Sequence, residues 1–322
     1  MEITIKDVAK YAGVGVGTVS RVINNEKAVG EKTRKKVLDA MKALNYSRNN
    51  MAFRLRKNET RIIALLVPVI NHPFFAQLAY YIEDEASKFG YSVVLVSSQQ
   101  KVDKETEIIT KISHREIDGA IFVTHYNHDE KDLQNYPIVS IDRRFGENVP
   151  YVTSDNYNAT KKAIEYMLDR GATKVGYIGS KPVVTSEVSE RERAYLDVMA
   201  ERNMPVRLVN KVIKHDEETV VVADFMEKYA DVDGVFVSGY TLSQVFYDHV
   251  AKLGKQIPND LQIVSYDGIF KNWGCTNITS VEQPIEEMAR QVVSLLVKKI
   301  RGEETIIRTV LETKFVPGTT TK

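Results

Sequence analysis

A regular alternation of apolar strands and amphipathic helices runs through the chain from residue 61 onward. Residues 62–67 form a continuous apolar run typical of a buried parallel strand, residues 74–89 repeat at helical spacing, and residues 91–96 form a second apolar run. The unit recurs, with further strands expected at 119–123, 138–141, 174–178, 234–237 and 261–265, and helices at 104–114, 158–170, 191–202, 217–229, 242–253 and 285–301. This order predicts an α/β fold with doubly wound parallel sheets.

Residues 61–322 are too many for one such sheet with a single core, so we expect two lobes with a cleft between them. The N-lobe should comprise about residues 61–156 and 286–314, and the C-lobe about 157–285 and 315–322. Ligands of open α/β sheets lie beyond the carboxyl ends of the strands. The polar residues expected there suit a polyhydroxy ligand: Asn71, His72, Thr124, His125, Asp142, Arg143, Gly179, Ser180, Gly239, Tyr240, Tyr266 and Asp267.

The first sixty residues differ from the rest in charge. They carry 13 Lys and Arg against 6 Asp and Glu, a balance of +7, whereas the other residues carry 31 against 37, a balance of −6. A small basic end on an acidic body indicates a polyanionic partner, for which nucleic acid is the leading candidate.

The pattern of the first 46 residues predicts a small all-α helix-turn-helix. Thr4 serves as a helix N-cap, Gly13 ends that helix, and 16–24 and 31–44 form two more helices. Burial of the apolar side of the second helix leaves Arg21 on the outer face, where it would contact a guanine in the major groove. Val16 would contact a thymine methyl group, and Thr18 or Ser20 would bind a phosphate. The alternative is a three-helix bundle whose basic face is merely solvated.

This segment resembles the lac repressor family in Thr4-Ile-Lys-Asp-Val-Ala-Lys-Tyr-Ala-Gly-Val, Thr18-Val-Ser-Arg-Val-Ile-Asn and Thr33-Arg-Lys-Lys-Val. Asn49-Asn-Met-Ala-Phe-Arg-Leu resembles the family's hinge, which implies that residues 47–60 form a linker whose Leu55 enters and kinks the minor groove. The alternative is that Ala52 and Leu55 pack on the third helix. The DNA-contacting residues are then expected to be Thr4, Val16, Gly17, Thr18, Ser20, Arg21, Asn24, Thr33, Asn49, Ala52 and Leu55.

Three departures from the family pattern concern this segment. Gly15 and Gly30 stand where a serine usually caps a helix, and Arg48 replaces a proline before the hinge. Gly17 removes a side chain from a position that often reads bases. The operator half-site therefore cannot be copied from relatives.

The body also resembles the family's periplasmic-binding-protein-like core, in motifs such as Asn71-His-Pro-Phe-Phe, Ser154-Asp-Asn-Tyr and Val264-Ser-Tyr-Asp-Gly, and looks closest to the sucrose operon repressors of Gram-positive bacteria. The resemblance implies a sugar effector such as sucrose, fructose or a phosphorylated sugar, held by Arg191 and Asp267 from opposed strand ends. At Ser238-Gly-Tyr-Thr relatives usually carry an Asn-Asp pair, which leaves the sugar open. The full expected set is His72, Phe74, Asp142, Arg143, Arg191, Tyr240, Asp267 and Gln283.

Other classes of protein fit the sequence less well. The single cysteine, Cys275, fits a reducing cytoplasm, and neither an export signal nor a membrane span is expected. We expect no cofactor, no catalytic residues and no metal, since His125, His128 and Asp129 are better interpreted as a solvated loop. An exported sugar receptor would lack the basic head.

Two further expectations concern partners. No leucine heptad follows the last predicted strand, so a homodimer is expected, built on N-lobe helices such as 74–89. A global carbon-catabolite regulator that uses a phosphocarrier protein as corepressor fits the same fold, and stays an alternative to a local sugar repressor.

Overall fold

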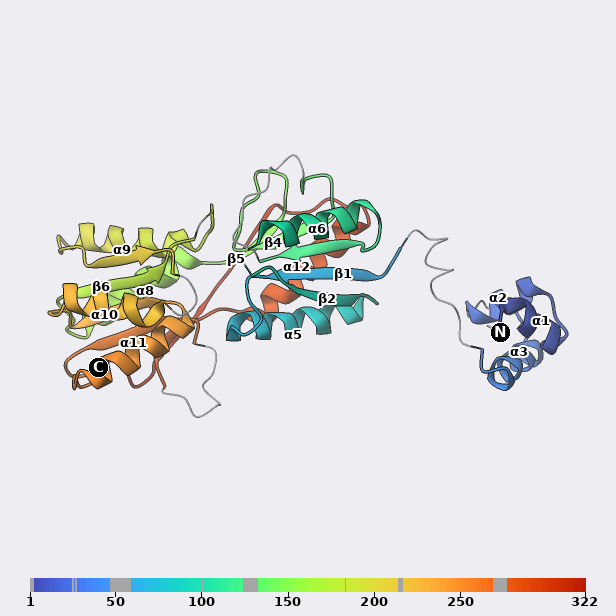
Figure 1. Cartoon of the computed structure of the whole chain (residues 1–322), viewed down its shortest axis with the longest axis horizontal. Helices are drawn as coiled ribbons and strands as arrows, with labels where there is room; N and C mark the ends of the chain where they lie inside the picture. Colours follow the sequence, from blue (N-terminus) through green and yellow to red (C-terminus); the bar gives the residue numbers. More distant parts are fainter. Residues whose placement is uncertain are drawn as a thin grey trace. The chain divides into compact units, whose positions relative to one another are not determined.

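The computed structural model describes residues 3–24, 26, 28–46, 59–99, 101–123, 133–182, 184–213, 217–268 and 277–322. The chain divides into two compact units, Met1–Thr60 and Arg61–Lys322, which we call the head and the core domain. Figure 1 shows both units, with labels on the helices and on several of the strands.

The head contains three helices, α1 (Ile5–Ala12), α2 (Val16–Ile23) and α3 (Glu31–Ala43). Asp7 Oδ2 accepts hydrogen bonds from the backbone nitrogen of Thr4 at 2.9 Å and from its Oγ1 at 2.7 Å, which closes the first turn of α1. These bonds hold the pKa of Asp7 below its usual value. Gly13 then ends α1 in the left-handed region, at φ +65°. The short turn to α2 confirms the predicted helix-turn-helix.

Gly15 and Gly30 are the N-caps of α2 and α3, and neither has a side-chain capping bond. A serine at either position would stabilise the helix by only a few tenths of a kcal/mol more. The head closes instead on a small apolar core, whose fully enclosed members are Val8, Val19 and Val37. Packing of the three helices therefore compensates for the weaker caps.

The core domain contains two six-stranded sheets, one in each lobe. The N-lobe sheet has the order β2-β1-β3-β4-β5-β11 and is parallel throughout, and the C-lobe sheet has the order β7-β6-β8-β9-β10-β12. Within the described residues, β12 is the one antiparallel strand, against β10. The strands are β1 (Ile62–Val67), β2 (Ser92–Ser97), β3 (Gly119–Phe122), β4 (Ile138–Ile141), β5 (Tyr151–Ser154), β6 (Val175–Ser180), β7 (Leu208–Lys211), β8 (Gly234–Ser238), β9 (Gln262–Tyr266), β10 (Thr279–Glu282), β11 (Arg308–Leu311) and β12 (Lys314–Val316).

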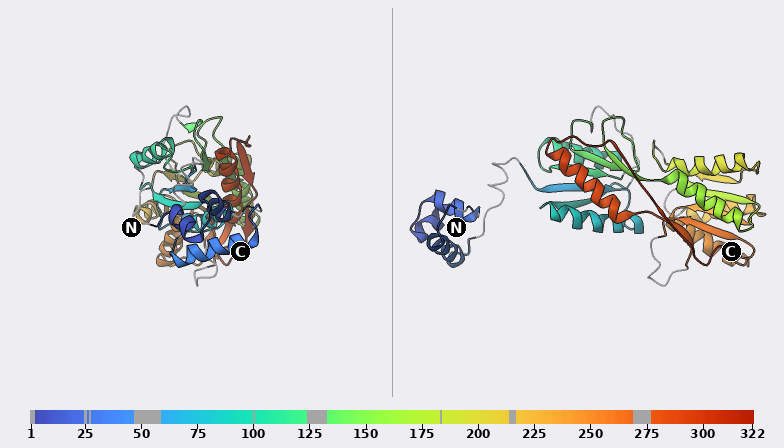
Figure 2. Two further views of the ribbon diagram at one scale, coloured as in Figure 1. Left: turned by 90° about the vertical axis from the view of Figure 1, so that its right-hand side faces the viewer. Right: turned by 180° about the vertical axis from the view of Figure 1, so that it is seen from behind.

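Helices cover both faces of each sheet. The N-lobe has α5 (Pro73–Lys88) and α12 (Ile285–Ile300) on one face and α6 (Val102–Ser113) on the other. The C-lobe has α8 (Asn156–Asp169) and α9 (Ser189–Glu201) on one face, and α10 (Glu218–Lys228) and α11 (Tyr240–Lys252) on the other. The chain crosses between the lobes after β5, after β10 and after β11, as Figure 2 shows from behind.

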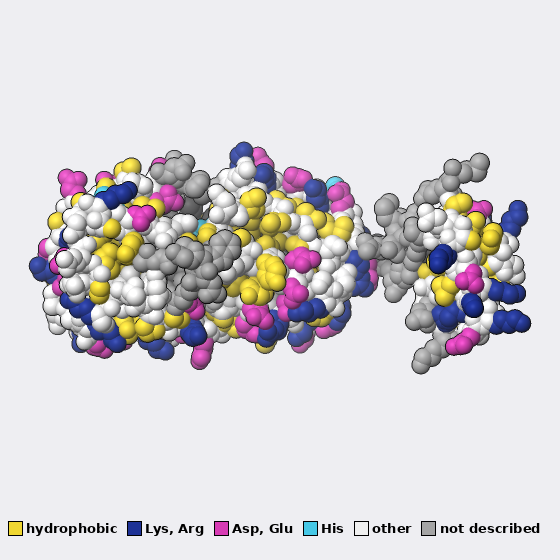
Figure 3. Space-filling model, turned by 90° about the horizontal axis from the view of Figure 1, so that it is seen from below, with side chains coloured by type: hydrophobic (Ala, Val, Ile, Leu, Met, Phe, Trp, Pro, Cys, Tyr) yellow, Lys and Arg dark blue, Asp and Glu magenta, His cyan; other side chains and the backbone are white. Residues whose placement is uncertain are grey.

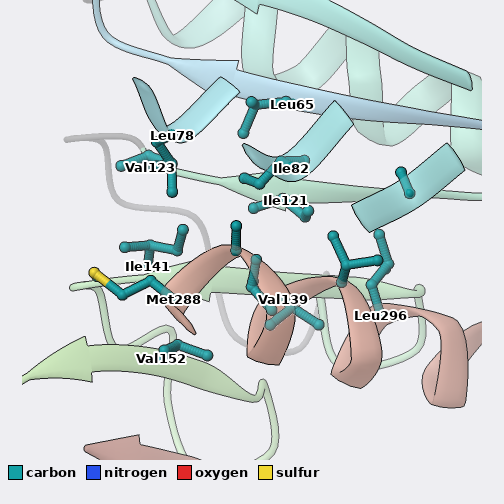
Figure 4. Packing of buried hydrophobic residues seen from close by; sticks show 14 of the residues in the cluster. Leu65, Leu78, Ile82, Ile121, Val123, Val139, Ile141, Val152, Met288 and Leu296 are labelled. Carbon is teal, nitrogen blue, oxygen red and sulfur yellow. The ribbon is translucent and has the colours of Figure 1, made fainter. Parts of the chain in front are cut away.

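The N-lobe core fixes the position of the strand ends. Figure 4 shows Leu78 and Ile82 of α5 and Met288 of α12 packed against the sheet residues Ile121 and Ile141. All of these side chains are almost fully buried. Fully burying such a side chain contributes about 1.5–3 kcal/mol, so the residues that follow β1 and β4 stand on a rigid base.

The predicted architecture is confirmed, but the sequence pattern missed five strands: β5, β7, β10, β11 and β12. Each has only three or four residues and most carry polar or charged side chains, so none reads as an apolar run. In the described part of the chain, no helix is long and apolar enough to cross a membrane.

Candidate functional site

The outer face of α2 in the head carries the expected base-reading residues. Val16 is 43% exposed, Gly17 and Arg21 are exposed, and Thr18 and Ser20 are partly buried. A β-carbon built on Gly17 would meet no atom within 4 Å, so this position leaves open space rather than filling a contact. The face is therefore shallow at Gly17 and presents Arg21 as its one basic group.

The remaining expected DNA contacts of the head lie at the ends of the helices. Thr4 uses its hydroxyl in the cap of α1, Asn24 ends α2, and Thr33 lies in the first turn of α3. The N-termini of α2 and α3 begin at glycines and point partial positive charge outward, which suits phosphate groups. Asn49, Ala52 and Leu55 lie outside the described residues.

In the core domain a polar cluster lies where the two lobes meet. Asp142 directly follows β4 of the N-lobe, and Asp267 directly follows β9 of the C-lobe. Both have a left-handed backbone, with φ of +58° and +72°. A non-glycine residue in that region costs free energy that the surrounding structure must offset, and such residues concentrate at functional sites.

Arg191 is the basic centre of this cluster. It lies in the first turn of α9 and is 4% exposed. Its Nε donates to Asn156 Oδ1 at 2.6 Å, and its guanidinium carbon lies 3.4 Å from the centroid of the Tyr266 ring. Asn156 is itself oriented, because its amide donates to the Ser154 carbonyl at 3.0 Å. Arg191 is thus held rigidly between the start of α8 and the end of β9.

A chain of hydrogen bonds then joins the lobes. Ser154 at the end of β5 donates to Gln283 Oε1 at 2.8 Å, and Gln283 Nε2 donates to Asp267 Oδ1 at 2.6 Å. Ser154 Oγ also lies 3.0 Å from the Tyr266 hydroxyl. The cluster therefore couples the position of one lobe to that of the other.

Burial shifts the pKa values of two titratable side chains in this cluster, Asp142 and His72. Burial raises the pKa of Asp142, while the charge of Arg191 and a 2.7 Å hydrogen bond from Thr153 oppose that rise. Burial lowers the pKa of His72, against the opposing charges of Asp267 and Glu218. His72 Nδ1 accepts from the backbone nitrogen of Phe74 at 3.2 Å, as expected of a neutral imidazole that caps α5.

Not every expected effector residue joins this cluster. Arg143 is 3% exposed, and its guanidinium carbon lies over the Phe145 ring, 4.2 Å from the ring centroid. Burial lowers the pKa of Arg143 to about 10, and the negative charge of Glu105 opposes that shift. Phe74 is buried in the N-lobe core. Tyr240 begins α11, with one residue between it and the end of β8. The last residue of β8, Ser238, accepts a 3.4 Å hydrogen bond at Oγ from Arg191 Nη1.

One geometric expectation was wrong. Arg191 and Asp267 were expected at opposed strand ends, but Arg191 lies on a helix and both residues belong to the C-lobe. The N-lobe instead supplies His72 and Asp142. Sequence reasoning also missed Asn156, although it lies in the Ser154-Asp-Asn-Tyr motif. His125, His128 and Asp129 lie outside the described residues, within which no group of His, Cys, Asp or Glu could hold a metal ion.

A helix-turn-helix head joined to a two-lobed core with buried polar groups between the lobes defines a ligand-responsive transcription regulator rather than an enzyme. Residues 4–49 match the bacterial regulatory proteins of the lacI family, and residues 164–321 match the periplasmic binding protein-like domain. The ribose operon repressor of Halalkalibacterium halodurans is 35% identical, over 99% of this chain and 97% of that protein. The chain belongs to the lacI family.

Two further likenesses extend over nearly the whole chain. The sucrose operon repressor of Streptococcus mutans is 32% identical, over 94% of this chain and 94% of that protein. The crystal structure of the lac repressor dimer bound to operator and the anti-inducer ONPF superposes with a TM-score of 0.87 at 20% identity, covering 99% of both chains. The second likeness establishes the fold.

Proposed function

We propose that this chain represses a sugar-utilisation operon by binding its operator as a homodimer, under the control of a small sugar bound between the lobes. The observation that carries the proposal is the cluster of Asp142, Arg191, Asp267 and Gln283, which joins the two lobes through hydrogen bonds. Carboxylates, an amide and a guanidinium beside an aromatic ring are the groups that bind sugar hydroxyls. The repressors of ribose and sucrose operons among its relatives support this effector class.

The head supplies the operator contacts. Arg21 on the exposed face of α2 is placed to read a guanine, while Thr18, Ser20 and the N-termini of α2 and α3 hold phosphates. Leu55 in the linker would act as the minor-groove wedge. Because phosphate contacts release counterions, operator affinity should fall steeply with salt.

The homodimer is supported by an apolar surface of the N-lobe. Strand β2 is an edge strand, with Val94 and Leu95 each 45% exposed, and Tyr80 on the adjacent α5 is 69% exposed. Figure 3 shows hydrophobic side chains gathered over the N-lobe when it is seen from below, the side on which α5 lies in Figure 1. Large exposed apolar patches mark interaction sites, and an uncovered edge strand invites pairing.

The proposal is tested on the full-length protein. Its preferred site is first selected from random DNA, and sugars are then screened by thermal shift, where a ligand at 100 times its Kd stabilises by about 2.7 kcal/mol. A hit should also change the affinity for the selected site. If no sugar alters either quantity, sugar control is rejected. Site binding that appears only with a phosphorylated phosphocarrier protein would instead support the global catabolite regulator.

A further inference from the structure

We propose that Asn156 is a positioning residue, which ties the orientation of Arg191 to the relative position of the two lobes. The inference rests on the proposed function, because it concerns how the sugar site communicates with the rest of the molecule. It follows from a directed chain of hydrogen bonds that begins at Arg191 in the C-lobe and ends at Asp142 in the N-lobe. Asn156 stands at the boundary, in the first position of α8 and two residues after the end of β5.

Each member of this chain donates a hydrogen bond to the next. Arg191 Nε donates to Asn156 Oδ1 at 2.6 Å, and Asn156 Nδ2 donates to Thr153 Oγ1 at 3.2 Å. Thr153 Oγ1 in turn donates to Asp142 Oδ1 at 2.7 Å. Asn156 and Thr153 are 2% and 0% exposed, so water does not compete for these bonds. Bonds that run in one direction from a cation to a carboxylate polarise one another, which strengthens the chain.

The amide of Asn156 supplies what both of its neighbours need. The Arg191 guanidinium has donors only, so it requires an acceptor on residue 156. The Thr153 hydroxyl has one proton, and the Asp142 carboxylate at 2.7 Å takes it in preference to the Ser154 carbonyl at 3.2 Å. Thr153 therefore requires a donor, which Asn156 Nδ2 provides. The same Nδ2 also donates to the Ser154 carbonyl at 3.0 Å, and this bond fixes the plane of the amide.

The bond between Asn156 and Thr153 is the link that crosses from one lobe to the other. Thr153 belongs to β5 in the N-lobe sheet, whereas Asn156 and Arg191 belong to α8 and α9 of the C-lobe. The chain crosses between the lobes at this point, so a turn of one lobe against the other changes the backbone dihedrals between the two residues. Arg191 is then fully supported in one lobe arrangement and less so in the other. A sugar bound to Arg191 thereby acquires the difference in affinity that a switch requires.

A double-mutant cycle on the full-length protein tests this link without any sugar. Arg191→Met removes the guanidinium, Thr153→Val removes the hydroxyl, and urea unfolding at pH 7 gives the unfolding equilibrium constant of each variant. If the chain connects the two residues, the product of the single effects should differ from the effect of the double variant by at least about three-fold, whereas unconnected sites agree within about two-fold. The matched control is Thr160→Val, one turn along α8, because Thr160 is fully buried and its hydroxyl has no hydrogen-bond partner among the described residues.

The same cycle in an Asn156→Leu background shows whether Asn156 carries the link. The effects of Arg191→Met and Thr153→Val should there combine independently, because leucine neither accepts from Arg191 nor donates to Thr153. A coupling that persists in this background would run through the charge of Asp142 and would overturn the inference. Independent effects in the parent background, or an equal coupling of Arg191→Met with Thr160→Val, would overturn it as well.

The second readout uses D-ribose, D-fructose and sucrose as probes, with the operator Kd measured with and without saturating sugar. For a probe that changes the parent's operator Kd, Thr153→Val should reduce that change at least about five-fold, while its sugar Kd changes less because Arg191 keeps its bond to Asn156. Thr153→Ser keeps the hydroxyl and should restore the response, and Thr160→Val should not alter it. A full response in Thr153→Val overturns the inference, also where Asn156→Leu does not fold. If none of these sugars changes the parent's operator Kd, the proposed sugar control fails, and the cycle alone decides on Asn156.

Discussion

Replacement of Arg191 by methionine is the sharpest test of the electrostatics of the cluster. Methionine keeps an unbranched side chain of similar length and removes only the guanidinium. Arg191 is 4% exposed, compensates the charge of Asp142 and donates a 2.6 Å hydrogen bond to Asn156. Its removal leaves the buried Asn156 oxygen without its donor, which costs about 1–3 kcal/mol. It also takes away a positive charge that favours ionised Asp142.

The loss should depend on pH in a defined direction. Burial already raises the pKa of Asp142 above the 3.8 of an unfolded chain, and the charge of Arg191 opposes that rise. Without Arg191 the folded-state pKa climbs further. The folded protein then binds more protons than the unfolded chain, so its stability increases as the pH falls through the folded-state pKa and is lost as the pH rises through it. The deficit of Arg191→Met should therefore be smaller at pH 5.5 than at pH 7.

Urea unfolding followed by circular dichroism at the two pH values measures both effects. The double variant Asp142→Asn/Arg191→Met removes the uncompensated charge and should recover part of the single variant's loss, about 1 kcal/mol. The Arg191 electrostatic argument is refuted if the single variant loses less than about 1 kcal/mol, or if its loss is the same at pH 5.5 and pH 7. The measured stability of Arg191→Met is also needed to interpret its functional assays. A destabilised variant can lose its response to sugar even where Arg191 makes no contact with the sugar.

Three further predictions concern DNA binding and assembly. Arg21→Ala should weaken operator binding by about 1–3 kcal/mol while binding to random DNA barely changes, measured by fluorescence anisotropy; an equal loss on both would make Arg21 a phosphate contact. Leu55→Ser should reduce DNA bending in a circular-permutation gel with sugar affinity intact, and unchanged bending would reject the wedge. Leu95→Lys on β2 should shift the chain toward monomer in analytical ultracentrifugation. The control is Ile306→Lys, which lies beside the opposite edge strand, is 70% exposed and should leave the dimer intact. The same behaviour in both variants would reject the β2 surface as the dimer contact.

The parts of the site that sequence reasoning predicted follow from a general property of parallel sheets. Asp142 and Asp267 come directly after apolar runs, β4 and β9, so their place at the carboxyl ends was predictable without knowledge of the partner elements. Arg191 has no such signal. It lies on a helix, and only the resemblance to a family singled it out.

The misses have equally local causes. Asp142 and Arg143 follow β4, and the left-handed backbone at Asp142 turns the chain there, so the two adjacent side chains take different directions. The structure turns Asp142 toward Arg191 and Arg143 toward Phe145. Asn156 was overlooked because it follows β5, a four-residue strand that ends in Thr153 and Ser154 and lacks the apolar pattern of its neighbours.

The interlobe contacts also constrain how a sugar can act on DNA binding. A ligand shifts a conformational equilibrium only by its difference in affinity for the two arrangements. In the described arrangement Gln283 already occupies an oxygen of Asp267, and Glu187 of the C-lobe accepts from Tyr151 at 2.8 Å and from Arg308 at 3.1 Å of the N-lobe. Gln283 belongs to the C-lobe, as Asp267 does, and its link to the N-lobe is the 2.8 Å hydrogen bond that it accepts from Ser154. A sugar that draws Gln283 away from both Asp267 and Ser154 would break this link and leave the Glu187 contacts as the pivot about which the lobes turn. The sense of regulation then depends on whether the bound sugar leaves Gln283 on Ser154.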